Sequence, residues 1–193
     1  IKVRFKIILE KLYFKIFIKN ISNLLVQTSS MYNLSMQYGI KKKIGICAFD
    51  DHITSKTNNL NEDIKEKNSF IYVASMHPHK NHLRLLQAFN TLKELNLKLY
   101  ITLDEKNKLA KTVLDFIKEN NLNVVVLNNI KRSDLIKHYK KSEALIYPST
   151  FEAYGLPLIE AKRYKLKIIV SDLDYAWDFI KPDYFFNPYD FKS

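Results

Sequence analysis

Two glutamates and a glycine mark the segment of this sequence that is best suited to bind a ligand. Seven residues separate Glu152 from Glu160, and Gly155, one of only three glycines in the chain, lies between them. Because carboxylates only accept hydrogen bonds, this pair suits a ligand that carries several hydroxyl groups. The alternative is that Glu152 lies on the surface and Glu160 on an exposed helix face, without any ligand.

The residues that follow Glu152 predict the start of a helix. Pro157 is tolerated in a first helical turn because its missing N–H costs nothing there, which puts Tyr154, Gly155 and Leu156 at the helix N-terminus. Free N–H groups at such a position attract phosphate or sugar oxygens, and glycine lets a ligand approach the backbone closely. Together with the two carboxylates, this start predicts a ligand with both phosphate and hydroxyl groups, such as a nucleotide sugar.

A second candidate binding loop spans residues 75–82 and contains the pair Lys80-Asn81. The pattern predicts a helix start at which Asn81 is the N-cap and Lys80 faces an anion. Three histidines, at positions 77, 79 and 82, raise the alternative of a metal site. No Asp, Glu or Cys joins them in the loop, so we expect them to pack within it and expect no metal.

The order of predicted strands and helices indicates how these loops are positioned. From residue 69 onward, short apolar runs alternate with helical patterns, which predicts parallel βαβ units in a Rossmann-like, doubly wound α/β fold. Ligands of such sheets bind beyond the carboxyl ends of the strands, where both candidate loops lie. We expect strands at 70–74, 97–103, 124–127, 144–148 and 167–171, and helices at 82–95, 106–120, 133–140 (with Ser133 as N-cap) and 158–164.

The chain before this region predicts a second, smaller part. Residues 1–49 contain two apolar runs, 23–28 and 44–49, that we expect to be strands, with a helix over 29–39 that ends at Gly39. Residues 50–68 are polar and predict a linker, which leaves 69–193 as the main domain.

The first 19 residues predict an amphipathic helix with a basic stripe formed by Arg4, Lys11, Lys15 and Lys19. Such a helix either lies on an anionic membrane or packs on a core outside this sequence. Polar and apolar residues alternate over residues 2–7, so the start of a β-strand is a third interpretation. No apolar run approaches the roughly 18 residues that a membrane span needs, and no signal peptide is visible.

The charge and composition of the chain indicate which kinds of partner it binds. The formal net charge is +11, with 31 basic residues against 20 acidic ones. Only four of the basic residues are arginines and the lysines are spread along the whole chain, whereas nucleic-acid binders rely on arginine forks, so we expect no nucleic-acid partner. Cys47 is the only cysteine, which suits a reducing, cytoplasmic location, with association at the inner membrane face as an extension of the helix hypothesis.

The segment from Glu152 to Glu160 resembles the signature of the retaining GT-B glycosyltransferases known as glycosyl transferases group 1. That signature is two glutamates seven residues apart with Phe-Gly-Leu-Pro between them, and Tyr154 stands here for the Phe. The similarity includes Pro148-Ser149, continues through Ala161 and residues 168–172, and ends at residues 186–188. Overall the resemblance covers residues 20–190.

The resemblance implies a role for each candidate residue. Glu160 would hold the nucleotide ribose, and Glu152, the candidate catalytic residue, would contact hydroxyls of the transferred sugar. Lys80 and the backbone near Gly155 would hold the diphosphate, without metal or cofactor. Ser75 stands where many members have an arginine, and Asn128-Asn129 where many have glycine. The substrate-binding set is Lys80, Asn81, Ala153, Tyr154, Gly155, Leu156 and Glu160.

The resemblance also implies an activity: transfer of a sugar from a nucleotide-diphosphate sugar to a saccharide or lipid-linked acceptor, in surface polysaccharide biosynthesis. Residues 69–193 would form the donor-binding domain, truncated at its C-terminus, and residues 1–49 the end of the acceptor domain. Because most of the acceptor domain is not in this sequence, we expect the chain alone not to catalyse transfer. The alternatives are a non-catalytic nucleotide-sugar-binding remnant, a sugar-nucleotide epimerase and a basic nucleic-acid-binding module.

Overall fold

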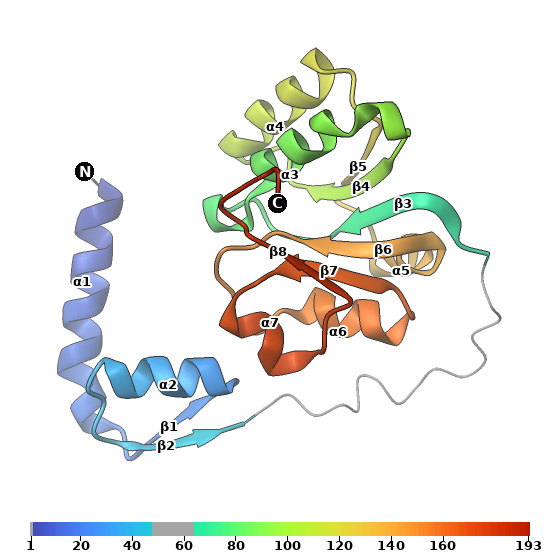
Figure 1. Ribbon diagram of the computed structural model, residues 1–193. Helices are drawn as coiled ribbons and strands as arrows, with labels where there is room; N and C mark the ends of the chain where they lie inside the picture. Colours follow the sequence, from blue (N-terminus) through green and yellow to red (C-terminus); the bar gives the residue numbers. More distant parts are fainter. Residues whose placement is uncertain (1, 48–63) are drawn as a thin grey trace. The chain divides into compact units, whose positions relative to one another are not determined.

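A parallel β-sheet with helices on both faces dominates the structure, a computed structural model that describes residues 2–47 and 64–193 (Figure 1). The chain divides into two compact units, one within residues 1–50 and one within residues 51–193. The larger unit confirms the predicted α/β class and carries every candidate site residue. Most of the predicted linker, 50–63, lies outside the described residues.

The smaller unit is a single parallel βαβ unit preceded by a long helix. Strands β1 (Asn23–Val26) and β2 (Lys43–Ile46) pair in parallel around helix α2 (Ser29–Gln37), which Thr28 caps by accepting a hydrogen bond from the Met31 amide. Gly39 follows this helix with a φ of +73°, the left-handed conformation that ends helices. The first residues form helix α1 (Lys2–Phe17), so the strand interpretation of residues 2–7 is wrong; the short 3₁₀ helix η1 (Ile18–Asn20) follows.

The larger unit contains six parallel strands in the order β5-β4-β3-β6-β7-β8. The chain therefore runs outward from β3 to one edge, returns to β6 beside β3, and runs outward to the other edge. This is the doubly wound arrangement that the alternating pattern predicts. The strands are β3 (Glu66–Tyr72), β4 (Lys98–Leu103), β5 (Val124–Asn128), β6 (Ser142–Tyr147), β7 (Lys167–Ser171) and β8 (Tyr184–Phe186).

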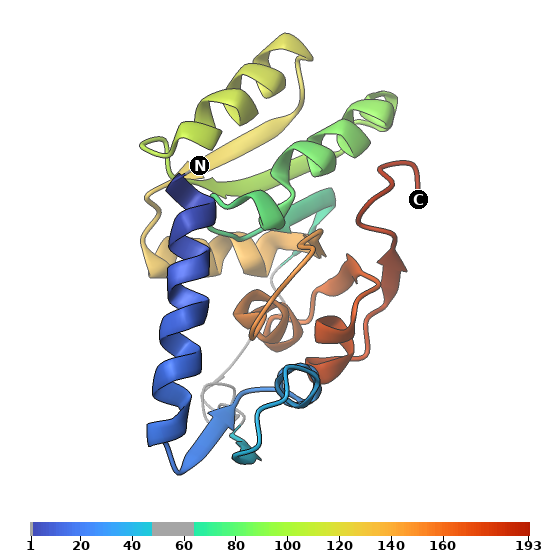
Figure 2. The same cartoon turned by 90° about the vertical axis from the view of Figure 1, so that its left-hand side faces the viewer.

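Right-handed crossovers place helices α3 and α4 on one face of this sheet and α5, α6 and α7 on the other (Figure 2). Helix α5 begins one residue before Ser133, which therefore lies in its first turn and is not the predicted N-cap; Lys131 holds that position without a side-chain cap. The helices are α3 (His82–Thr91), α4 (Lys108–Glu119), α5 (Arg132–Lys141), α6 (Leu156–Arg163) and α7 (Asp174–Phe179), with 3₁₀ turns η3 (Pro78–Lys80) and η4 (Lys93–Leu95).

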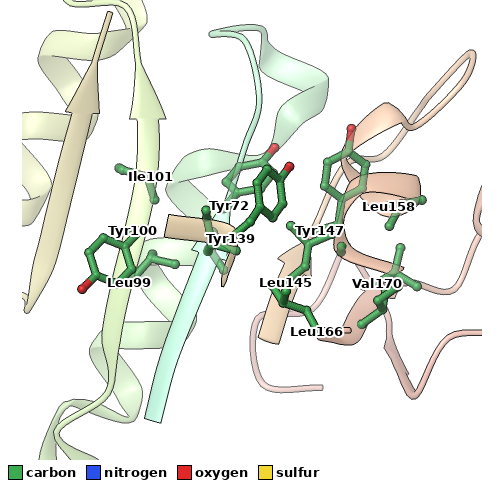
Figure 3. Close-up of a cluster of buried hydrophobic side chains, with 14 of the residues drawn as sticks. Tyr72, Leu99, Tyr100, Ile101, Tyr139, Leu145, Tyr147, Leu158, Leu166 and Val170 are labelled. Carbon is green, nitrogen blue, oxygen red and sulfur yellow. The ribbon is translucent and has the colours of Figure 1, made fainter. Parts of the chain in front are cut away.

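The core lies along both faces of the central strands. Aliphatic residues such as Leu99, Leu145 and Val170 are fully buried, together with the tyrosines Tyr72 and Tyr147 of the two neighbouring central strands (Figure 3). Strand β3 begins at Glu66, inside the segment predicted as linker. The Glu66 carboxylate accepts hydrogen bonds from Lys98 and Tyr100 of the adjacent strand, which explains how so polar a sequence forms a strand.

Asparagine replaces glycine at most of the tight turns. Five asparagines have φ between +47° and +61°, a left-handed conformation that asparagine tolerates better than other residues with a side chain. Asn129 is one of them, at the position where the resemblance leads us to expect glycine. The scarcity of glycine therefore does not remove these turns, which are formed by Asn68, Asn81, Asn96, Asn121 and Asn129.

Candidate functional site

The two candidate loops leave the sheet from neighbouring strands at the point where the strand order reverses. Strands β3 and β6 are adjacent, and the connections that follow them run in opposite directions along the sheet. Loops that diverge in this way open a crevice at the carboxyl edge, which is where doubly wound folds bind their ligands. Lys80 follows β3 and Glu152 follows β6, so the topology alone brings them to the same edge of the sheet.

Lys80 and Glu152 are in direct contact at this edge of the sheet. The Lys80 Nζ forms an ion pair with Glu152 Oε1, and the same oxygen accepts a hydrogen bond of 2.7 Å from the Tyr147 hydroxyl. The side chains of Lys80 and Glu152 are only 11% and 9% exposed, so water screens their charges weakly. Burial, followed by the charge of Glu152, raises the pKa of Tyr147 well above its usual range, so this phenol remains a hydrogen-bond donor.

Backbone contacts hold the two loops together around this pair. The Thr150 amide donates to the His79 carbonyl over 2.8 Å, and the Tyr72 hydroxyl donates to the Lys80 carbonyl. On the other side, the Tyr175 hydroxyl donates to the Ser149 carbonyl over 2.9 Å. These contacts fix the backbone on both sides of the ion pair, so the two charged groups are held in place before any ligand arrives.

Helix α6 begins at Leu156, where Pro157 and Gly155 predict and two residues before the start of the helix expected at 158–164. Gly155 is the N-cap residue with a φ of +55°, Leu156 is the first helical residue, and the Leu158 amide donates to the Gly155 carbonyl over 2.9 Å. The loop residues Ala153 and Tyr154 connect Glu152 to this helix, and Leu156 is 48% exposed. A helix start of this kind presents amide groups and a partial positive charge to an anion.

Glu160 lies in the second turn of α6 and has a partner of its own. Arg132 Nη1, at the start of α5, lies 2.5 Å from Glu160 Oε1. The Glu160 side chain is 10% exposed, whereas that of Arg132 is 57% exposed. Burial and, next, the Glu160 charge raise the pKa of the buried Tyr139 hydroxyl, so this phenol is neutral.

The loop after β3 differs from the prediction in one respect. Asn81 is the N-cap residue of α3, but its side chain does not cap the helix. Its backbone is left-handed, with a φ of +61°, and its amide Nδ2 instead donates to the Pro188 carbonyl over 2.8 Å. Asn81 therefore joins this loop to the end of the chain.

The three histidines of this loop have separate environments. The rings of His77 and His79 stack with centroids 5.5 Å apart, whereas His82 is buried against Tyr72. Among the described residues, no group of three or more His, Cys, Asp or Glu side chains is arranged to hold a metal ion. Burial and the nearby Lys80 charge lower the pKa of His79, so its imidazole is protonated less readily than an exposed histidine.

Sequence reasoning missed two residues that contact the glutamates, Tyr147 and Arg132. Tyr147 ends an otherwise aliphatic strand, and a tyrosine there needs a hydrogen-bond partner, which was the available signal. Arg132 is one of only four arginines in the chain and stands directly before a predicted helix. Which glutamate each would contact depends on the folded arrangement of β5, β6 and α6.

A protein-family model supports the resemblance over most of the chain. The model described as "Glycosyl transferases group 1" matches residues 55–190, which include both candidate loops. The chain is also 33% identical over 124 residues to the serotype-specific mannosyltransferase WbdA of Escherichia coli, which covers 58% of this chain and 15% of WbdA. It is 32% identical over 122 residues to the capsular polysaccharide biosynthesis glycosyltransferase CapH of Staphylococcus aureus, covering 60% of this chain and 34% of CapH.

A solved structure shares the fold. The crystal structure of a mutant of S. aureus TarM, in complex with fondaparinux, alpha-GlcNAc-glycerol and UDP, superposes with a TM-score of 0.77 at 18% identity. The superposition covers 91% of this chain and 36% of the TarM chain. This chain thus spans well under half the length of these proteins.

Proposed function

The chain belongs to the glycosyl transferases group 1 family, and on that premise we propose that its larger unit binds a nucleotide-diphosphate sugar as the donor of a sugar-transfer reaction. The observation that carries this proposal is the convergence of Lys80 and Glu152 beside the start of α6, at the switch point of the sheet. A point cation, a helix N-terminus and carboxylates together match a diphosphate flanked by two hydroxyl-rich groups.

Each part of the donor has a matching group in this site. Lys80 and the amides at the start of α6 hold the diphosphate, with Asn81, Ala153, Tyr154, Gly155 and Leu156 forming the surrounding loops. Glu160 accepts hydrogen bonds from the ribose hydroxyls, and Glu152 accepts them from the transferred sugar. Since Tyr147 and Lys80 already hold Glu152 Oε1, this carboxylate is oriented before the donor binds.

The chemical contribution of this site is to position the donor and to stabilise the leaving group. When the bond between the sugar and the diphosphate breaks, negative charge grows on the diphosphate. Lys80 and the α6 amides are held in place by the fold, so they stabilise that charge without rearrangement. We propose that transfer retains the anomeric configuration, as the signature between Glu152 and Glu160 suggests.

The relatives suggest the acceptor class. WbdA is a serotype-specific mannosyltransferase and CapH a capsular polysaccharide biosynthesis enzyme. We propose by analogy that the protein of which this sequence is part acts in surface polysaccharide biosynthesis, on a saccharide or lipid-linked acceptor in the cytoplasm. The matching part of this chain corresponds to 15% of WbdA and 34% of CapH.

Helix α1 supports a further proposal, association with an anionic membrane surface. Seven apolar residues from Ile8 to Phe17 are 44–65% exposed, and Lys11 and Lys15 of the same helix and Lys19 of η1 are exposed as well. Exposed apolar groups and lysines match a layer of acyl chains beneath anionic headgroups. In the described part of the chain, no helix has the length and apolar character needed to cross a bilayer.

The membrane proposal is tested by sedimentation with vesicles. Binding should require anionic lipid, weaken as salt is raised, and fall when Lys11 and Lys15 are both replaced by glutamate. Equal sedimentation with neutral and anionic vesicles would contradict the electrostatic part of the proposal.

The donor-site proposal is tested by calorimetry with a free nucleoside diphosphate and the matching nucleotide sugar. Lys80→Ala should weaken both ligands by roughly ten- to a hundredfold, the range expected for losing a charge-assisted contact. Glu160→Ala should also weaken both, while Glu152→Ala should weaken the nucleotide sugar more than the free diphosphate. Lys137→Ala, which removes an exposed lysine paired with Asp134 elsewhere on the surface, is the matched control. If Glu152→Ala weakened both ligands equally, its assignment to the sugar would be wrong.

A further inference from the structure

The contact between Arg132 and Glu160 differs from an ordinary surface ion pair. Arg132 is 57% exposed, but the carboxylate that it contacts, 2.5 Å away, belongs to a side chain that is only 10% exposed. A carboxylate with so little access to water needs a compensating charge or hydrogen bonds, because burial disfavours the charged form. Arg132 supplies that charge from the solvent side of Glu160.

The elements around this contact define how Glu160 is held. Glu160 projects from α6, Arg132 is the first residue of α5, and α5 also provides Tyr139. Burial and, next, the Glu160 charge raise the pKa of the Tyr139 hydroxyl. The position of the Glu160 carboxylate is therefore tied to the first residue of α5 through the Arg132 ion pair.

Resting on the donor-site proposal, in which Glu160 holds the ribose, we propose that Arg132 is a positioning residue for this carboxylate. Arg132 occupies Oε1 and so fixes the direction in which the carboxylate faces the ribose hydroxyls. Through Glu160 it determines how strongly the site prefers ribonucleotides over their 2′-deoxy counterparts. The guanidinium itself contacts Glu160, not the ribose.

Arginine suits this role better than lysine would. Its planar guanidinium has several N–H groups in a fixed geometry and holds a carboxylate at a defined angle, whereas an ammonium acts as a point charge. The adjacent Lys131 carries the same charge at the N-cap of α5 and has no ion pair with Glu160 among the described residues. It therefore provides a matched control for the loss of positive charge at this end of the helix.

The test is calorimetric titration with UDP, GDP and ADP, followed by the 2′-deoxy form of each diphosphate that binds. The measured quantity is the ratio of the Kd for the deoxy form to the Kd for the ribo form. In the wild-type chain we expect a ratio of about ten or more, the loss of one hydrogen bond to a charged group. Arg132→Ala should lower this ratio several-fold towards that of Glu160→Gln, Arg132→Lys should restore part of it, and Lys131→Ala should leave it unchanged.

The double variant Arg132→Ala/Glu160→Gln separates an action through Glu160 from an independent one. If Arg132 acts through Glu160, the double variant should have the same ratio as Glu160→Gln alone. Equal weakening of the ribo and deoxy forms by Arg132→Ala would overturn the proposal and indicate a direct contact with the phosphates. An unchanged ratio in Arg132→Ala would overturn it as well. If the wild-type chain bound none of the three diphosphates, the donor-site proposal itself would fail, which is a different result from a wild-type preference that Arg132 does not affect.

Discussion

The ion pair between Lys80 and Glu152 makes a quantitative prediction about stability. Both side chains are about nine-tenths buried, and Glu152 also accepts the Tyr147 hydrogen bond. Removing one partner of a buried pair costs roughly 3–5 kcal/mol, against about 0–1 kcal/mol for a surface pair. Because this pair keeps some access to water, we expect Glu152→Ala to lower the free energy of unfolding by about 3 kcal/mol.

Replacing the other partner of the ion pair, Lys80, should cost less stability. In Lys80→Ala, Glu152 keeps its hydrogen bond from Tyr147, so we expect a loss of about 2 kcal/mol. The double variant Lys80→Ala/Glu152→Ala leaves no unpaired charge, and its loss should fall short of the two single losses together by about 2 kcal/mol. This shortfall is the coupling energy of the pair.

Urea denaturation followed by tryptophan fluorescence measures these values. Trp177 is the only tryptophan and lies in α7, so its signal reports on the larger unit. The exposed pair Lys137 and Asp134 on α5 is the control cycle, and its coupling should be far smaller. If the effects of Lys80→Ala and Glu152→Ala were additive within about 0.5 kcal/mol, the two groups would not be coupled and the reasoning from burial would be refuted.

Two further predictions concern the backbone and the pH dependence of the same unit. Burial and the Lys80 charge lower the pKa of His82 to about 4. As the pH falls, the unfolded chain therefore binds a proton at this histidine before the folded chain does. The free energy of unfolding should then fall by up to about 3 kcal/mol between pH 6.5 and pH 4. His82→Phe should flatten this pH profile in urea denaturation, and an unchanged profile would assign the acid sensitivity to other groups. Gly155→Ala should destabilise the unit by about 1 kcal/mol, because residue 155 has a φ of +55°. Gly155→Asn should cost less, since five asparagines of this chain adopt the same left-handed conformation. Equal losses of stability for the two variants in thermal unfolding would contradict this explanation.

The strands and helices of the larger unit were largely predictable because burial on both faces leaves a clear pattern. Continuous apolar runs such as residues 144–148 and 167–171 occur where helices cover both sides of a parallel sheet. The start of α6 was predictable for a local reason, since Gly155 and Pro157 specify the helix boundary by themselves. Other element boundaries were harder to predict. Strand β3 begins at Glu66, inside the predicted linker, and helix α5 begins before Ser133, the predicted N-cap.

The contacts within the site were not predictable from local sequence. Lys80 and Glu152 are 72 residues apart and meet only because β3 lies beside β6, an arrangement that depends on the whole strand order. Asn81 was expected to cap its own helix, but its side chain binds the Pro188 carbonyl, 107 residues away. Local preference and tertiary contacts compete for the same polar group, and here the tertiary contact prevailed.

The most direct test of the donor site is a titration of the chain with UDP, GDP and ADP and their common sugar derivatives, compared with the Lys80→Ala variant. We predict that at least one nucleoside diphosphate binds with one-to-one stoichiometry and that Lys80→Ala weakens it by roughly ten- to a hundredfold. Binding of none of these ligands by a correctly folded chain, or binding that Lys80→Ala leaves unchanged, would contradict the assignment of this crevice to a nucleotide-sugar donor.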